Sequence, residues 1–299
     1  MIGIPYMGSK RKLSKPIIDF IIAQNPNAKF FYDLFGGGGS VSFEALKRKQ
    51  FEAVYYNEFN TGIVELLKKI RTNGVTPEFY NWIDRETFKK HKNDNDWFGG
   101  LLKTCWSFGN NQKNYLFGKD IEEPKRRMHE IVVNCCNDSL AWFNRNYDTE
   151  ISELLFNLKT IKERRLYLRS VCSQRIDMQQ LERLEQLQEL ERLEQLDSLQ
   201  ISNLSYELLN VNTPIDETII YCDPPYKGTG KYQKDIDHDL FLDWVKNSKY
   251  KIYISSYEVD LPIVKEFVHR STLSANANNK VVERLFCNKQ ENNNILKLF

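Results

Sequence analysis

The chain has 299 residues, of which 41% are hydrophobic and 27% charged, and its formal net charge is +2. This length suits roughly two domains, and an aromatic share of 13% supplies enough core-forming side chains to exclude a disordered or collagen-like protein. No apolar run approaches the ~20 residues that a membrane-spanning helix needs. Charged residues 10–12 interrupt the N-terminus before an apolar secretion signal could form. We therefore expect a cytoplasmic protein that does not contact membranes.

The cysteines are too few and too scattered for a disulfide framework, and no pair has the Cys-x-x-Cys spacing of a metal site. Reduced and mostly buried thiols are typical of such residues. We predict neither disulfides nor a metal centre for these six: Cys105, Cys135, Cys136, Cys172, Cys222 and Cys287.

The first seventy residues alternate between helical and strand patterns. Residues 12–22 have apolar side chains at helical spacing, and residues 29–35 form a short apolar run that ends in four glycines. A second helical pattern at 40–49, an apolar run at 53–56 and a third helical pattern at 63–70 follow. This βαβα order predicts an α/β fold with a doubly wound parallel sheet.

The second half of the chain returns to strand patterns at 218–222 and 250–254, followed by a helical pattern at 256–267. Two apolar segments near the end, 281–286 and 292–299, are expected to pair as antiparallel strands. The sheet should therefore finish with an antiparallel C-terminal strand.

The middle of the chain interleaves aromatic and basic residues without strand alternation, which predicts a mainly helical inserted domain. We place this insert at 73–170 and the surrounding sheet domain at 1–72 and 200–299. A linker at 171–199 separates them, and leucine recurs at every third position from 181 to 199. Leucines three apart step ~60° backwards around an α-helix, so they circle its axis and disfavour a coiled-coil seam. Residues 181–199 carry a formal charge of −4, which leaves +6 on the rest of the chain.

The glycine-rich turn after the first predicted strand has the composition of a ligand-binding crevice. Asp33-Leu34-Phe35-Gly36-Gly37-Gly38-Gly39-Ser40 joins a strand to a helix, where glycines let a nucleotide-like ligand approach the backbone. A glycine run alone fits an ordinary loop equally well. Glu58 directly follows the second predicted strand, and its carboxylate could accept hydrogen bonds from both hydroxyls of a ribose.

The tetrapeptide Asp223-Pro224-Pro225-Tyr226 is the most specific pattern in the chain. Two consecutive prolines cannot donate to a sheet ladder, so the strand before them must stop there. A carboxylate, a rigid carbonyl and an aromatic ring then follow one another at the end of a central strand. Such a set suits a planar ring with an exocyclic amine. Asp223 and the Pro224 carbonyl would accept the two amine hydrogens, and Tyr226 would stack on the ring.

With Tyr6-Met7-Gly8-Ser9-Lys10 near the N-terminus, these motifs together resemble the D12-class, Dam-like DNA adenine-N6 methyltransferases. The chain departs from the pattern of many members at three places. It has Tyr6 in place of Trp, Gly8-Ser9 in place of Gly-Gly, and Glu58 in place of Asp, and these departures are chemically mild. The resemblance implies an S-adenosylmethionine-dependent methyltransferase sheet. It assigns the catalytic role to Asp223, Pro224 and Tyr226. The cofactor-binding residues that it implies are Tyr6, Lys10, Asp33, Phe35, Gly36, Gly38, Glu58 and Asp223.

The order of the motifs resembles the alpha group of these enzymes, whose insert is the target recognition domain. Basic and amide side chains there would contact phosphates and base edges of double-stranded DNA. The insert has two basic clusters, one at 125–127 and one at 162–169. The candidate DNA-binding residues are Asn111, Lys113, Arg126, Arg127, Lys227 and Lys231.

The expected reaction is transfer of a methyl group from S-adenosylmethionine to N6 of an adenine flipped out of duplex DNA, without a metal. Flipping is needed because N6 inside a paired duplex cannot be approached in line with the methyl–sulfur bond. We expect a monomer or weak dimer of bacterial or phage origin, in a restriction-modification or solitary setting. Two alternatives stay open: a methyltransferase for RNA adenine or protein glutamine, and a catalytically silent, sequence-specific DNA-binding protein.

Overall fold

Contacts within the chain define two compact units. The computed structural model describes residues 3–172, 178–191, 196–225, 236–270 and 280–289. We call the first of the two units the sheet unit; it comprises Met1–Ile4, Gly8–Val64 and Leu193–Phe299. We call the second the helical unit; it comprises Pro5–Met7 and Glu65–Arg192.

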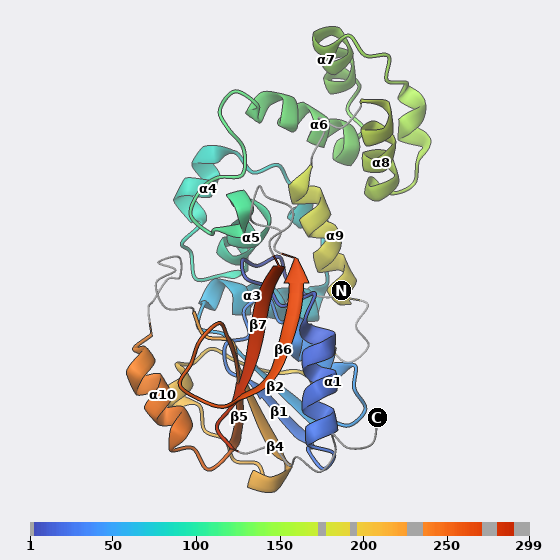
Figure 1. Ribbon diagram of the computed structural model, residues 1–299. Coiled ribbons are helices and arrows are strands. Elements are labelled where there is room, and N and C mark those ends of the chain that lie inside the picture. Colours follow the sequence, from blue (N-terminus) through green and yellow to red (C-terminus); the bar gives the residue numbers. More distant parts are fainter. Residues whose placement is uncertain (1–2, 173–177, 192–195, 226–235, 271–279, 290–299) are drawn as a thin grey trace. The chain divides into compact units, whose positions relative to one another are not determined.

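The sheet unit is built on a seven-stranded sheet in the order β3-β2-β1-β4-β5-β7-β6 (Figure 1). The five strands from β3 to β5 are mutually parallel, whereas β7 runs antiparallel to both β5 and β6. This order is consistent with a methyltransferase fold. The strands are β1 (Phe30–Asp33), β2 (Ala53–Asn57), β3 (Gln200–Ser202), β4 (Thr218–Cys222), β5 (Lys251–Ser256), β6 (Ile263–Arg270) and β7 (Lys280–Cys287).

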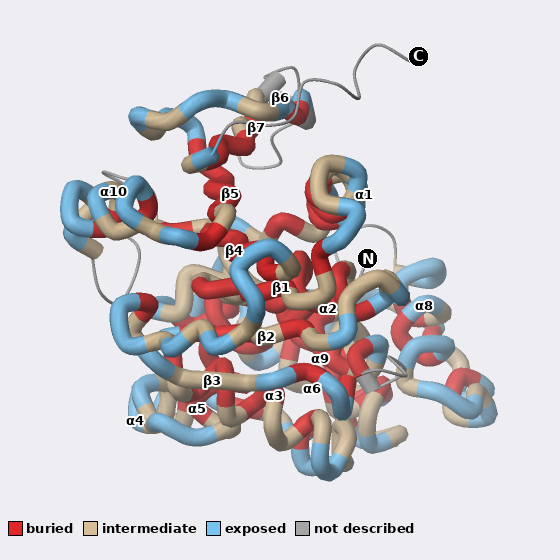
Figure 2. The backbone as a smooth tube through the Cα atoms, turned by 90° about the horizontal axis from the view of Figure 1, so that it is seen from below, coloured by how far each residue is buried: buried red, intermediate tan, exposed pale blue. Residues whose placement is uncertain are grey.

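The central strands β4 and β5 are almost completely buried. All five residues of β4 and five of the six in β5 are buried. Figure 2 colours the chain by burial. Parallel strands covered on both faces read as continuous apolar runs rather than alternating ones. The helices that begin in this unit are α1 (Ser14–Gln24), α2 (Ser40–Leu46), α3 (Thr61–Asn73), which crosses into the helical unit, and α10 (His238–Lys246).

The α/β prediction and its parallel start are confirmed, but the prediction for the end of the chain is partly wrong. The helix expected at 256–267 is absent, and β6 occupies its second half. Pro262 removes a backbone donor there, and the β-branched residues that follow favour a strand. Strand β7 pairs with β5 and β6. The expected partner segment at 292–299 lies outside the described residues.

The helical unit consists of short helices with an aromatic core. Trp82 stacks on Phe117 with ring planes 1° apart, and it meets Trp106 and His129 edge-on. Asp84, Asp96 and Thr160 cap three helices by accepting backbone N–H bonds. The helices are α4 (Arg85–His91), α5 (Trp97–Cys105), α6 (Glu122–Asn134), α7 (Asn137–Tyr147), α8 (Ile161–Val171) and α9 (Gln179–Glu191).

The first half of the leucine repeat is part of the helical unit's core and not a linker. Leu181, Leu184, Leu187 and Leu190 on α9 are all fully buried. Four leucines at this spacing spread over about half of the helix circumference, so they need cover on more than one side. Helix α5 and residues 77–80 pack against α9. The unit accordingly extends to Arg192, past the boundary expected at 170.

Across the residues that the structure describes, no helix has both the length and the apolar character to cross a membrane. In that same part of the chain, no cluster of three or more His, Cys, Asp or Glu side chains could hold a metal ion.

Candidate functional site

The glycine turn between β1 and α2 is tethered to β2. Gly36 donates its N–H to the Asn57 carbonyl at 2.8 Å, and the Tyr56 hydroxyl donates to the Gly37 carbonyl at 2.7 Å. Gly37 and Gly39 adopt positive φ values of 49° and 71°, which favour glycine. A Cβ on Gly36 would lie 2.2 Å from the Tyr56 ring. The turn therefore has no space for a side chain at Gly36.

Glu58 is buried beside this turn, and backbone groups fix its carboxylate. One oxygen accepts the N–H of Gly37 and the other accepts the N–H of Asn60, both at 2.8 Å. Burial raises the pKa of Glu58, and these N–H donors partly counteract the rise. Each carboxylate oxygen can accept a further hydrogen bond. Asn203 holds the following turn by donating to the carbonyls of Glu58 and Phe59.

Asp33 ends β1 with a buried carboxyl group. Its Oδ2 accepts a hydrogen bond from the Ser42 hydroxyl at 2.7 Å, whereas Oδ1 has no hydrogen-bond partner among the described residues. Burial raises the pKa of Asp33 to about 7; the Ser42 hydrogen bond opposes the rise, and the charges of Asp223 and Glu58 add to it. Such an acceptor is a place for a ligand's hydrogen-bond donor.

Two other cofactor candidates line the same turn. Phe35 packs edge-on against Phe241 and tilted against Tyr206, with ring centroids 5.5 Å and 5.7 Å apart. The Gly38 carbonyl accepts the N–H of Ile4 at 2.8 Å. The structure therefore brings Asp33, Phe35, Gly36, Gly38 and Glu58 together, whereas Tyr6 belongs to the helical unit.

Asp223 follows β4, and the N-terminal motif supplies its partner. The Lys10 ammonium donates to Asp223 Oδ1 at 2.8 Å and lies 3.5 Å from Glu283 Oε1. The side chains of Lys10 and Glu283 are only 7% and 3% exposed, compared with 19% for Asp223. Pro224 is buried directly after Asp223. Lys10, expected at the cofactor, thus forms an ion pair with the expected catalytic carboxylate.

Neither Glu283 nor Ser42 was predicted as a site residue from the sequence. Glu283 is an acid inside the apolar segment 281–286, and this was the only signal that could have found it. Ser42 gives no signal of its own, because it becomes relevant only through the packing of α2 beside Asp33.

A family model for the D12 class N6 adenine-specific DNA methyltransferases matches residues 6–286. The chain belongs to this family. It is accordingly an adenine-specific DNA methyltransferase. A search of curated proteins finds no match for the chain.

Two of the candidate DNA-binding residues of this methyltransferase lie in an exposed loop of the helical unit. Asn111 Oδ1 accepts the backbone N–H groups of Lys113 and Asn114, both at 2.9 Å. The Lys113 side chain is exposed, and its carbonyl accepts a bond from the Lys92 ammonium. Asn111 therefore shapes the loop, and Lys113 is accessible from solvent.

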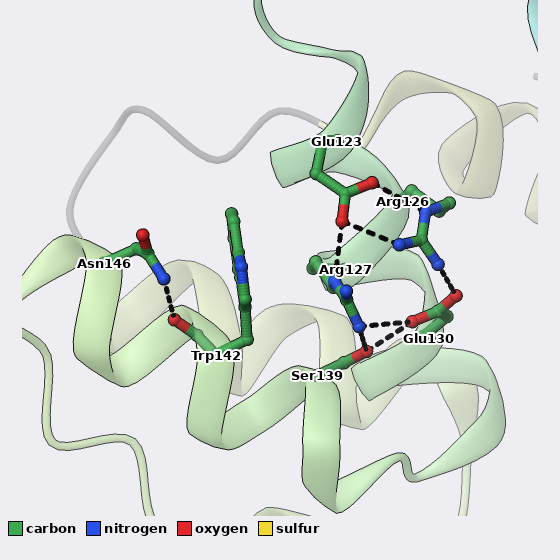
Figure 3. Close-up of polar contacts among 7 residues, drawn as sticks. All are labelled: Glu123, Arg126, Arg127, Glu130, Ser139, Trp142 and Asn146. Carbon is green, nitrogen blue, oxygen red and sulfur yellow. Dashed lines mark hydrogen bonds and ion pairs between the residues drawn. The ribbon is translucent and has the colours of Figure 1, made fainter.

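Arg126 and Arg127 on α6 are already engaged within the helical unit (Figure 3). Arg126 forms ion pairs with Glu123 and Glu130, and Arg127 pairs with the same two acids. Arg127 also donates to the Ser139 hydroxyl of α7 at 3.2 Å. Both guanidinium charges are therefore largely balanced by neighbouring carboxylates.

Two arginines of the basic cluster at 162–169 are structural as well. Arg164 Nε donates to the Val132 carbonyl at 2.6 Å. Arg165 of α8 pairs with Glu182 and Glu185 of α9 at 2.8 Å and 3.0 Å. These buried side chains join helices and do not present their charge to solvent, contrary to the expectation of phosphate contacts. The remaining site candidates, Tyr226, Lys227 and Lys231, lie outside the described residues.

Proposed function

We propose that this enzyme binds S-adenosylmethionine in the sheet unit and methylates N6 of an adenine flipped out of duplex DNA. The observation that carries the proposal is Asp223, held by Lys10 and followed by a buried proline, at the end of the buried strand β4. A carboxylate and a rigid carbonyl in sequence suit an exocyclic amine better than any other group of a base.

The residues present fit the cofactor. Glu58 offers lone pairs on a fixed carboxylate for the ribose hydroxyls, and Asp33 Oδ1 is a buried acceptor that has no partner among the described residues. Gly36 lets the turn pack directly on the Tyr56 ring, where a Cβ would clash. When bound, S-adenosylmethionine supplies an electrophilic methyl group on its sulfonium. Lys10, Phe35, Gly38 and Asp223 complete the set that we assign to the pocket, and only the family motif assigns Tyr6 to cofactor binding.

The chain's own residues then act on the base. Asp223 and the Pro224 carbonyl accept the amine hydrogens and favour the positively charged nitrogen of the transition state over the planar ground state. Tyr226 lies outside the described residues, and we assign to it the stacking on the flipped ring, which is worth ~1–3 kcal/mol per base.

We assign the helical unit to target recognition and the sheet unit to catalysis. Within the helical unit, the exposed loop with Asn111 and Lys113 is the stronger candidate for DNA contact. Arg126 and Arg127 would have to exchange carboxylates for phosphates. Lys227 and Lys231 would contact the flipped strand from the segment after the tetrapeptide.

Modification-sensitive sequencing of DNA from cells making the protein tests the proposal. We expect N6-methyladenine in one short motif, and we expect Asp223→Ala to abolish it while DNA binding by the purified protein survives. Asp216→Ala, at an exposed acid just before β4, is the matched control and should methylate normally. Methylated RNA or protein without methylated DNA would contradict the proposal, and so would an Asp223→Ala variant that keeps more than a few per cent of the activity.

A further inference from the structure

Glu283 is a buried carboxylate next to the proposed catalytic pair. Its side chain is 3% exposed, although it lies in a strand whose neighbouring positions are largely apolar. An isolated carboxylate is expensive to bury unless a charge or hydrogen bonds compensate it. The Lys10 ammonium lies 3.5 Å from Glu283 Oε1 and 2.8 Å from Asp223 Oδ1. One cation is therefore shared between two carboxylates.

The direction of β7 explains how Glu283 reaches this position. Cys222 of β4 is level with Ile254 of β5, and Ser256 at the end of β5 is level with Arg284 of β7. Since β7 runs antiparallel, its early residues lie at the edge where the parallel strands end. Glu283 is thus placed at the carboxyl edge of the sheet, beside the residues that follow β4 and β5.

Two tyrosines report on the charges in this cluster. Burial is the main cause that raises the pKa of Tyr257, the Glu283 and Asp223 charges raise it further, and Lys10 lowers it. The pKa of buried Tyr221 is raised by burial first, and Asp223, Asp33 and Glu283 act in the same direction. Lys10, Asp223 and Glu283 therefore act on the same small region, with Tyr257 and Tyr221 next to them.

We propose that Glu283 is a positioning residue for methyl transfer, which holds the Lys10 ammonium beside Asp223 and offsets its charge. This inference rests on the proposed function, because it assumes that Asp223 accepts from the reacting amine. Without Glu283, the lysine and Asp223 would form a formally neutral pair. Glu283 adds one formal negative charge beside this pair, which favours the positive nitrogen of the transition state.

The test compares Glu283→Gln with Glu266→Gln. Glu266 lies on the adjacent strand β6 and pairs at the surface with Arg284, so its variant controls for the loss of a carboxylate from the same hairpin. Single-turnover methylation is measured on a duplex that contains the motif found by sequencing. We expect Glu283→Gln to slow the methylation step by about tenfold to hundredfold, by analogy with residues that orient the ligands of metal sites. The DNA dissociation constant should stay within twofold, the cofactor affinity should fall by less than the rate, and Glu266→Gln should react like wild type.

Two further measurements separate positioning from simple structural support. Glu283→Asp keeps the charge and should recover a large part of the rate. In Glu283→Gln, carbon-13 tyrosine NMR, assigned with Tyr257→Phe, should show Tyr257 ionising at lower pH than in wild type, because a neighbouring negative charge has been removed.

Several outcomes would overturn the inference. They are a Glu283→Gln rate within twofold of wild type, a cofactor affinity that falls in proportion to the rate, and an Asp variant as slow as the Gln variant. If Glu283→Gln does not fold, the Asp variant decides alone. Failure of the proposed function looks different, because Asp223→Ala would then remain active. An inactive Asp223→Ala beside a fully active Glu283→Gln would refute only the inference.

Discussion

Replacing Asp33 with asparagine should make the unliganded protein's stability less sensitive to pH. Burial raises the pKa of Asp33 to about 7, from a usual value of 3.8. The native carboxyl therefore keeps its proton to a higher pH than the unfolded one, and the native state binds more protons between these values. Stability from this group is fully present below the unfolded pKa and is lost as pH rises through the folded pKa.

The size of the effect follows from the two pKa values. Each pKa unit corresponds to about 1.4 kcal/mol, so wild type should lose about 3 kcal/mol relative to Asp33→Asn between about pH 5 and about pH 8. The amide cannot ionise, and it can still accept the Ser42 hydroxyl bond through its oxygen.

Urea unfolding followed by circular dichroism, without cofactor, measures the free energy of unfolding across this pH range. The exposed Asp216 gives the control Asp216→Asn, whose pH dependence should follow that of wild type. Parallel pH profiles for wild type and Asp33→Asn would refute the raised pKa. If wild type instead lost stability relative to Asp33→Asn as the pH falls, the pKa of Asp33 would be lowered by folding and not raised.

Two other predictions concern the turn and the leucine repeat. Gly36→Ala should raise the cofactor dissociation constant by at least about tenfold, or about 1.4 kcal/mol, because its Cβ would lie 2.2 Å from the buried Tyr56 ring. Calorimetric titration measures this, and a second change, Tyr56→Leu, should restore part of the affinity; unchanged binding by Gly36→Ala alone would contradict the geometry. Leu184→Ala on α9 should lower the free energy of unfolding by about 2–5 kcal/mol, because the leucine is fully buried. Denaturant unfolding measures this loss, and Leu154→Ala at a 69% exposed position is the control. If both variants lost equally little free energy of unfolding, the repeat would be a linker and not part of a core.

The sequence by itself determined the central strands of the sheet and the motifs that define the candidate site. Strands β1, β2, β4 and β5 were predictable because they are continuous apolar runs, and such runs follow from burial on both faces. The glycine turn and the tetrapeptide at 223–226 were visible because glycine and proline act on their own backbone. These signals depend only on residues near in sequence, so they can be recognised without knowledge of the fold.

The tertiary structure decided the features that depend on partners distant in sequence. Strand β6 is an edge strand with mostly exposed side chains, so it has no clear periodicity, and pairing with β7 makes it a strand. Helix α9 belongs to a core because α5 covers it, which its spacing of leucines does not reveal.

The roles of charged residues depend most clearly on partners that are distant in sequence. Arg165 looked like a phosphate contact until α9 supplied its two carboxylates. Glu283 looked like one acid in a C-terminal strand, and only the antiparallel direction of β7 placed it beside Lys10. A charge acquires its role from whichever opposite charge the fold brings within a few ångströms, and the sequence contains no local record of that distance.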